Sequence, residues 1–240
     1  MATFVLIHGG CTGGWSWETV VPLLEKRGHT VLAPDLPGMG EDKTPLKDVS
    51  LDYWARFVAR LIKQQAEPVI LVGRSRGGIV ISRTAEFAVE RIRALVYIAA
   101  MLVPNGETMG AVSDWVPRDT SFLVLSDDGL TLTIDREKAK AATFNTTPDD
   151  VAERLLSRFG PEPAASFTWP MHLTEERFGR IPRVYIETLR DRAIPIELQR
   201  LMQRRLPCRT VITMDTDHAA ASSGPEELSA HLSAVSEYIR

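Results

Sequence analysis

A serine between two glycines is the residue of this chain best placed for nucleophilic chemistry. Residues 73–77 match G-x-S-x-G with Ser75 at the centre, between an expected strand over 69–72 and an expected helix over 77–89. In this setting the serine occupies a sharp turn that lifts its hydroxyl above the sheet, and the flanking glycines let the backbone segments pass closely. The pattern predicts Ser75 as a nucleophile; the alternative is an ordinary turn between a strand and a helix.

A serine hydroxyl attacks only weakly without a neighbouring base, and His218 is the best placed of the five histidines. It follows the expected strand over 210–214, at the carboxyl end of the sheet, where Ser75 also lies. Ligands of open α/β sheets bind outside those ends, and serine, acid, histidine is a chain order that catalytic triads use. We therefore expect His218 to act as the base. The other histidines are His8, His29, His172 and His231.

The acid that orients the histidine is expected on the strand or loop before it. Asp191 follows the expected strand over 183–187 and precedes His218 in the chain, so we predict it as the acid that stabilises the protonated imidazole. Glu187, at the end of the same strand, is the alternative. Asp217 is adjacent to His218 and badly placed to reach back along the ring, so we expect it to cap the loop.

Backbone amides near the serine could stabilise an oxyanion, the negatively charged oxygen that forms during acyl transfer. One donor is expected to be the amide of Arg76, directly after the nucleophile, and the other should come from an early strand–helix loop. We choose Gly10, in the loop after the first strand, because a glycine lets this loop approach closely. The alternative is a glycine-rich loop that only turns the chain. The patterns G-x-G-x-x-G and Walker A both fail here, so no nucleotide, metal or other cofactor is predicted.

These residues depend on a sheet that brings strand ends together. At 240 residues the chain has the length of one domain with an insertion. Short, continuous apolar runs alternate with amphipathic stretches, which predicts an α/β fold: a mainly parallel sheet of about six strands flanked by helices. This rhythm breaks over 104–180, so we predict a core of residues 1–103 and 181–240 and a cap over 104–180. The elements expected in the cap are a β-hairpin and two helices, over 121–134, 136–143 and 148–159.

The composition narrows the class of partner. The net charge of −3 gives no basic field for nucleic acid, and no apolar run approaches the ~20 residues of a membrane helix. Two cysteines form no disulfide framework and suit a reducing cytoplasm, and no signal peptide precedes the first expected strand. We expect a cytoplasmic protein that acts on a small molecule, with no nucleic acid and no membrane as partner; a homodimer stays open.

Four stretches together resemble the α/β-hydrolase superfamily, in the branch that holds plant methylesterases, hydroxynitrile lyases and small bacterial esterases. They are residues 8–15 (H-G-G-C-T-G-G-W), the turn around Ser75, 184–186 with 191–195, and the pair 217–218. The triad that this resemblance implies is Ser75, Asp191 and His218. The implied oxyanion donors are Gly10 and Arg76.

The resemblance also implies that the insertion is a cap that roofs an acyl pocket. Within it, Trp115 is similar in position to an aromatic residue that faces the pocket in that family. Other aromatic residues of the insertion are expected either to line the pocket or to fill the small core of the cap: Phe122, Phe144, Phe167 and Trp169.

Two departures bear on the reaction. Most members of the branch carry histidine before the nucleophile, where this chain has Arg74, and its lyases carry threonine and lysine where this chain has Gly9 and Ala219. With neither lyase group present, we predict a cofactor-free serine hydrolase that cleaves small carboxylic or carbamic esters. The guanidinium groups of Arg74 and Arg76 are expected in salt bridges or in solvent. The alternatives are a hydroxynitrile lyase and a poorly catalytic small-molecule receptor.

Overall fold

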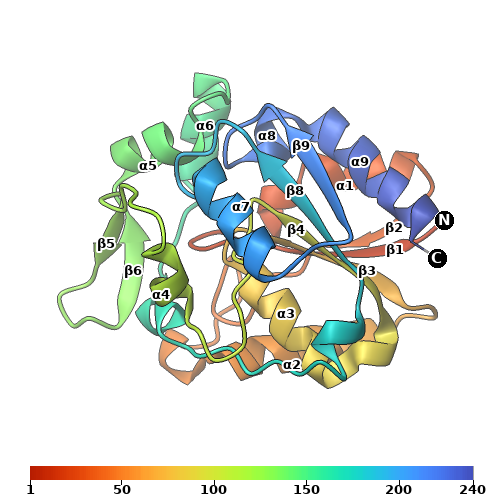
Figure 1. The fold of residues 1–240 in the computed structure, drawn as a ribbon. Helices are drawn as coiled ribbons and strands as arrows, with labels where there is room; N and C mark the ends of the chain where they lie inside the picture. The colour runs from red at the N-terminus through yellow and green to blue at the C-terminus, as the bar shows by residue number, and fades with distance from the viewer. Residues whose placement is uncertain (240) are drawn as a thin grey trace.

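The computed structural model describes residues 1–239, and its centre is a sheet of six parallel strands (Figure 1). The order across the sheet is β2-β1-β3-β4-β8-β9. The strands are β1 (Thr3–Ile7), β2 (Thr30–Leu32), β3 (Val69–Arg74), β4 (Ile92–Ile98), β8 (Arg183–Thr188) and β9 (Thr210–Met214). The predicted fold class, a mainly parallel sheet of about six strands flanked by helices, is confirmed.

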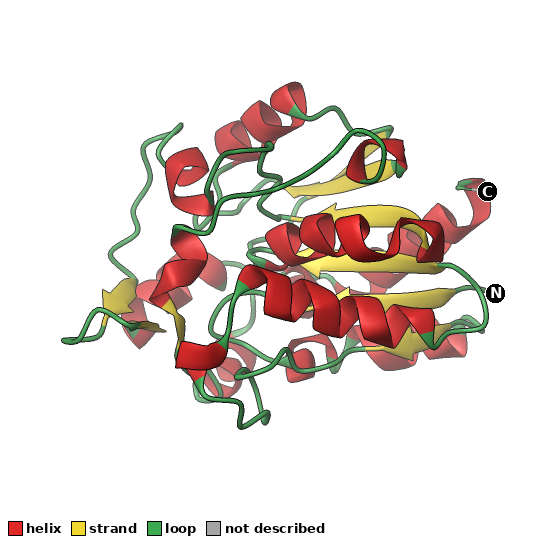
Figure 2. Cartoon of the chain, turned by 90° about the horizontal axis from the view of Figure 1, so that it is seen from below, coloured by secondary structure: helices red, strands yellow, loops and turns green. Residues whose placement is uncertain are grey.

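Helices cover both faces of this sheet, and Figure 2 shows those of one face in front of the strands. The first face packs against α2 (Leu51–Lys63), α3 (Gly77–Ala88) and α7 (Ile196–Arg205). The second face packs against α1 (Val20–Lys26), α8 (Ala220–Ser223) and α9 (Pro225–Tyr238). Along β1, Val5 and Ile7 point into the first layer, whereas Phe4 and Leu6 point into the second. Burial on both faces explains why the strands read as continuous apolar runs.

The register of the strands brings their carboxyl ends to one edge. Ile7 of β1 pairs with Gly73 of β3, and Arg74 pairs with Ile98 of β4. Ile98 in turn pairs with Ile186 of β8. The turns that follow these strands therefore open on the same side of the molecule, the side where the chain between β4 and β8 lies (Figure 2).

The chain between β4 and β8 forms a second, antiparallel sheet with three helices beside it. Its strands are β5 (Leu123–Leu125), β6 (Thr131–Ile134) and β7 (Glu162–Pro163). Its helices are α4 (Met109–Ser113), α5 (Arg136–Thr143) and α6 (Asp149–Leu156). The expected hairpin and the helix over 136–143 are confirmed, but the helix expected to reach residue 159 ends at Leu156. The sequence does not predict β7, because Pro163 lacks the amide of a regular strand and is tolerated only at the edge of this sheet.

Short 3-10 helices complete the connections. They are η1 (Gly14–Trp17), η2 (Leu46–Asp48), η3 (Val89–Arg91), η4 (Ala164–Phe167) and η5 (Phe178–Arg180). None of the helices formed by residues 1–239 is long and apolar enough to cross a membrane.

Candidate active site

Ser75 sits in a strained turn between β3 and α3. Its φ angle is +54°, in the left-handed region that residues other than glycine rarely adopt. The neighbouring glycines are required by close backbone contacts: a Cβ on Gly73 would lie 2.7 Å from the carbonyl oxygen of Gly77, and one on Gly77 would lie 2.7 Å from that of Ile7. The Ser75 amide donates to the carbonyl of Ile98 at 3.2 Å, which anchors the turn to β4. The serine is therefore held at the carboxyl edge of the sheet, as its sequence pattern predicts.

His218 and Asp191 form a buried pair in the loops after β9 and β8. Nδ1 of His218 donates to Oδ2 of Asp191 at 2.7 Å. The other carboxylate oxygen accepts the amides of Ala193 and Ile194, each at 2.8 Å, and the hydroxyl of Thr188 donates to Oδ2 at 3.2 Å. This set of donors fixes the carboxylate, and the carboxylate leaves Nε2 of His218 as the free proton acceptor of the ring.

The two other acids near His218 have different partners. Glu187 accepts hydrogen bonds from Arg200 and Thr213, and His218 pairs with Asp191 instead. Asp217 accepts the amides of Thr146 and Ala219, so it caps the loop as expected and ties it to the insertion.

The loop after β1 is fixed by a buried, neutral histidine. Nε2 of His8 accepts the amide of Leu36 at 3.1 Å, and Nδ1 donates to the carbonyl of Gly9 at 2.9 Å. Burial and the positive charge of Arg76 lower the pKa of His8 to about 3. The imidazole of His8 therefore stays neutral while it holds the loop. Both of its nitrogens are used in hydrogen bonds, so neither is free for catalysis.

We expect His8 to make the protein less stable in mild acid. The pKa of His8 is lowered from 6.5 in the unfolded chain to about 3 in the folded state, so only the unfolded chain binds this proton between those values. The contribution of neutral His8 to stability is fully present above pH 6.5. Below that pH the free energy of unfolding falls by up to about 1.4 kcal/mol per pH unit. Urea denaturation of the wild type and His8→Gln at pH 7 and pH 5 measures this loss. Equal pH dependence in the two proteins would contradict the assignment.

Gly10 and Arg76 place two unused backbone amides beside the serine. Both residues line the same cavity as Ser75 and His218. Within residues 1–239, neither amide donates to a protein acceptor. A free N–H at the start of α3, which the helix dipole makes more positive, suits the binding of an anionic oxygen.

The side chain of Arg76 belongs to a buried ion pair with the insertion. Its Nε lies 2.6 Å from Oε2 of Glu162 on β7, and both side chains are 3% exposed. The guanidinium also donates to the carbonyl of Gly9 at 3.0 Å and lies over the ring of Trp54 at 4.2 Å. Oε1 of Glu162 lies 2.7 Å from the position that a Cβ on Gly10 would take, so a side chain there would displace the carboxylate of this ion pair. The expectation of a salt bridge for Arg76 is confirmed, and the bridge fastens the insertion to both predicted amide donors.

Removing the acid of this pair should destabilise the protein. Glu162→Gln leaves the guanidinium of Arg76 buried without a counter-charge, which costs about 3–5 kcal/mol of unfolding free energy. The matched control is Glu90→Gln, which breaks the exposed ion pair with Arg180 and should cost about 1 kcal/mol or less. Chemical denaturation of the three proteins at neutral pH compares them. Equal losses in the two variants would show that the buried pair does not fasten the insertion.

Arg74 contradicts the sequence-based expectation. Its side chain is 7% exposed, and within residues 1–239 its guanidinium makes neither a hydrogen bond nor an ion pair. A Cβ on Gly9 would lie 3.2 Å from Nη2 of Arg74 and 3.0 Å from Cβ of Ser75, so the cation and the serine meet at this glycine. Arg74 also lines a small adjoining cavity with Ala219. The expectation of a salt bridge or solvent exposure is wrong for Arg74, because the short turn carries its side chain under the loop after β1 rather than outward.

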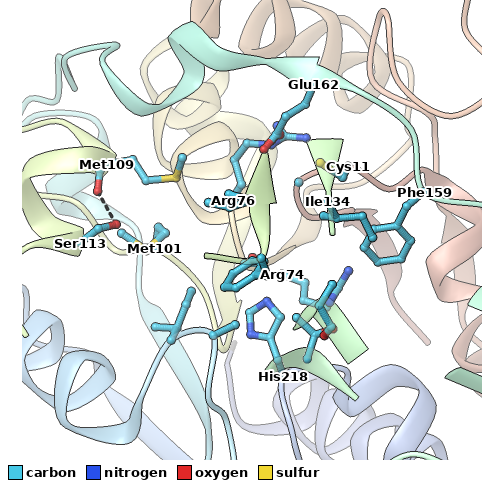
Figure 3. Close-up of a pocket in the computed structure, with 18 of the residues that line it drawn as sticks. Cys11, Arg74, Arg76, Met101, Met109, Ser113, Ile134, Phe159, Glu162 and His218 are labelled. Atoms are coloured by element: carbon cyan, nitrogen blue, oxygen red, sulfur yellow. Dashed lines mark hydrogen bonds and ion pairs between the residues drawn. The ribbon is translucent and has the colours of Figure 1, made fainter. Parts of the chain in front are cut away.

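One cavity connects these groups (Figure 3). Its apolar wall comes from the insertion and includes Phe122, Ile134, Phe144, Phe159 and Phe167. Four aromatic residues of the insertion were expected either to line the pocket or to fill the core of the cap. Three of them line the cavity, namely Phe122, Phe144 and Phe167. Trp169 instead packs against Trp54 at 5.2 Å between ring centroids.

Trp115 does not line the cavity, contrary to its expected position. Its ring packs beside the main core, with the guanidinium of Arg205 5.1 Å from the ring centroid. The sequence did not indicate that Cys11 would reach the same cavity. Burial raises the pKa of the Cys11 thiol well above its usual value, so this sulfur stays protonated and is a poor nucleophile.

Comparison with known proteins agrees with this geometry. Residues 4–231 match the sequence pattern described as the alpha/beta hydrolase family. The chain belongs to the α/β-hydrolase family. Methylesterase 1 of Arabidopsis thaliana is 30% identical over 243 residues, which cover 94% of this chain and 92% of that protein. A pyrethroid hydrolase of Sphingobium wenxiniae is 33% identical over 93% of this chain and 84% of its own length. The chain spans just over half, 56%, of the longer putative methylesterase 13, chloroplastic, of Arabidopsis thaliana.

A solved structure supports the same place within the α/β-hydrolases. The crystal structure of a pyrethroid hydrolase from Sphingobium faniae JZ-2 superposes with a TM-score of 0.87 and 29% identity, over 99% of this chain and 98% of that one. These relatives place this α/β-hydrolase in the methylesterase-like branch, among carboxylic-ester hydrolases.

Proposed function

We propose that this α/β-hydrolase is a serine esterase that cleaves small carboxylic or carbamic esters through an acyl-enzyme. The observation that carries the proposal is that Ser75 and His218 line one cavity while Asp191 holds the far side of the imidazole at 2.7 Å. Residues 104–180 are the cap in this proposal, and residues 1–103 with 181–240 are the catalytic core. The phenylalanines of the cap bind the apolar part of the substrate by excluding water from it.

In each half of the reaction cycle, acylation and then deacylation, His218 accepts one proton and gives one proton back. Nε2 of His218 takes the proton of the Ser75 hydroxyl while the serine oxygen attacks the ester carbonyl. The amides of Gly10 and Arg76 receive the negative oxygen of the tetrahedral intermediate. The imidazolium then gives its proton to the departing alcohol, and Asp191 stabilises the positive ring. Water, activated by the same imidazole, attacks the acyl-enzyme and releases the acid.

Turnover of a substrate panel tests the proposal. Activated short-chain esters, carbamates and anilides are compared at pH 7.5 by release of the chromogenic group. We expect ester hydrolysis to be fastest, because an alcohol leaves more readily than an amine from the tetrahedral intermediate. A folded protein that binds these compounds without turning them over would instead support the receptor alternative.

One observation favours the lyase alternative. Arg74 places a cation near Gly9 and Ala219, where the sequence predicts no charged group. Hydrolysis remains the proposal, because the amides of Gly10 and Arg76 suit an acyl oxyanion and the relatives named above are ester hydrolases. A cytoplasmic location, a homodimer and the absence of a nucleic-acid partner stay predictions.

We expect no release of cyanide from mandelonitrile above the buffer rate. Position 9 carries no hydroxyl to orient the hydroxyl of a cyanohydrin, so the substrate would be poorly placed for elimination. The measurement is colorimetric detection of cyanide with wild type and Ser75→Ala at pH 5.5. Stereoselective release of cyanide that depends on Ser75 would support the lyase alternative and contradict the proposed hydrolysis.

A further inference from the structure

Arg74 is a buried cation without a partner among residues 1–239. Its Nε is enclosed and makes no hydrogen bond within the described residues 1–239. Taking a guanidinium out of water without a partner costs several kcal/mol, so such groups are rare unless a ligand supplies the counter-charge. Burial lowers the pKa of Arg74 to about 10, which still leaves it protonated at neutral pH.

The charges around the cavity favour an anion. Three arginines line it, namely Arg74, Arg76 and Arg118. Glu162 neutralises Arg76, while the guanidinium of Arg118 donates to the carbonyl of Ala193 and to the Ser113 hydroxyl. Glu162 is the only carboxylate side chain among the lining residues of the described chain. Arg74 is thus the one of the three whose guanidinium has no hydrogen-bond or ion-pair partner among residues 1–239, and its two Nη groups remain for a ligand.

The acids nearest to Arg74 do not satisfy it. The carboxylates of Asp191 and Asp217 attract it through space, but neither lies within ion-pair distance. Asp191 is committed to His218 and to the amides of Ala193 and Ile194. These fixed carboxylates keep the cation in place and leave its outer side open to the cavity.

We propose that the pocket selects esters that carry a carboxylate a few bonds from the scissile carbonyl, and that Arg74 binds this carboxylate. The inference rests on the proposed esterase function and names its substrate class. Nη2 of Arg74 and Cβ of Ser75 both lie close to Gly9, so the cation lies beside the nucleophile, and both residues line the same cavity. A singly charged, planar carboxylate matches one guanidinium fork, whereas a phosphate dianion carries one charge more than Arg74 neutralises.

Two matched pairs of esters test this preference and locate the anion. Monomethyl succinate and its neutral amide, methyl succinamate, place the group on the acyl side. O-acetylglycolate and O-acetylglycolamide place it on the alcohol side. Hydrolysis is followed by acid release in a pH-stat, and kcat/KM is compared within each pair. The wild type should favour the anionic member of at least one pair by about 10-fold or more, and the pair with the larger ratio identifies the side.

Variants of Arg74 and Arg118 distinguish a specific effect of Arg74 from a general effect of positive charge in the pocket. Arg74→Gln should lower the anionic-to-neutral ratio of kcat/KM by about 10- to 100-fold, the worth of one charged hydrogen bond, and Arg74→Lys should restore part of it. Arg118→Gln removes an arginine from the same wall, one that already donates to Ala193 and Ser113, and it should lower the ratio far less than Arg74→Gln does. An unchanged ratio in Arg74→Gln, or a wild type without preference in either pair, overturns the inference.

A measurement on the wild type alone keeps the inference testable if Arg74 variants fail to fold. Succinamate, a monoanion, should inhibit hydrolysis of a neutral ester competitively, and the neutral succinamide should inhibit at least 10-fold more weakly. Equal inhibition by the two overturns the inference. Hydrolysis of neutral esters without an anionic preference would remove only this inference, whereas no hydrolysis of any ester would remove the proposed function as well.

Discussion

Ser75→Ala should fold like the wild type and lose about 10⁴- to 10⁶-fold in kcat for ester hydrolysis. The loss is large because the hydroxyl is the atom that attacks the carbonyl, and no other group at the strained turn can replace it. The fold should survive, because alanine takes the φ of +54° at a cost similar to that of serine and the hydrogen bond from the backbone amide of residue 75 to the carbonyl of Ile98 is retained. The measurement is kcat on a chromogenic short-chain ester, with thermal denaturation as the check on folding.

Ser113→Ala is the matched control for this loss. Ser113 also lines the cavity, but its hydroxyl donates to the carbonyl of Met109 and cannot attack a substrate. We expect a loss far smaller than that of Ser75→Ala. A folded Ser75→Ala protein with turnover near that of the wild type would contradict the mechanism.

Asp191→Asn should lower kcat by about 10⁴-fold with little change in KM. An asparagine can present its amide group to Nδ1 of His218, which favours the tautomer that carries the proton on Nε2. The ring then cannot accept the proton of Ser75, and it also loses the negative charge that stabilises the imidazolium. Steady-state kinetics on the same ester from pH 6 to pH 9 measure both effects.

Glu187→Gln separates the two acids considered from the sequence. Glu187 is held by Arg200 and Thr213 away from His218, so its loss should affect stability more than kcat. If Glu187→Gln lost 10⁴-fold and Asp191→Asn did not, the assignment of the acid would be wrong.

The sequence predicts the central sheet and the meeting of Ser75, Asp191 and His218 because the signals are local. Each of these residues follows an apolar run that reads as a buried strand, and parallel strands place such residues at one edge. The chain order and the glycines around Ser75 add geometric requirements that few other segments meet.

The environment of the two arginines beside Ser75 could not be predicted in the same way. Arg74 and Arg76 have the same residue type and the same distance from the serine, yet one is paired and the other is not. The difference depends on Glu162, which lies far along the chain on a two-residue strand that contains a proline. The position of Trp115 likewise depends on how the insertion packs, for which periodicity gives no signal.

Covalent trapping of the nucleophile tests the central claim most directly. The protein is mixed with diethyl p-nitrophenyl phosphate, which transfers its phosphoryl group to an activated serine and releases p-nitrophenol. We expect a burst of one equivalent of p-nitrophenol, and mass spectrometry of the digested protein should find the adduct on the peptide that contains Ser75. The burst should be strongly slowed in His218→Ala. An adduct on Cys11 instead of Ser75, or none at all in a folded protein, would contradict the account.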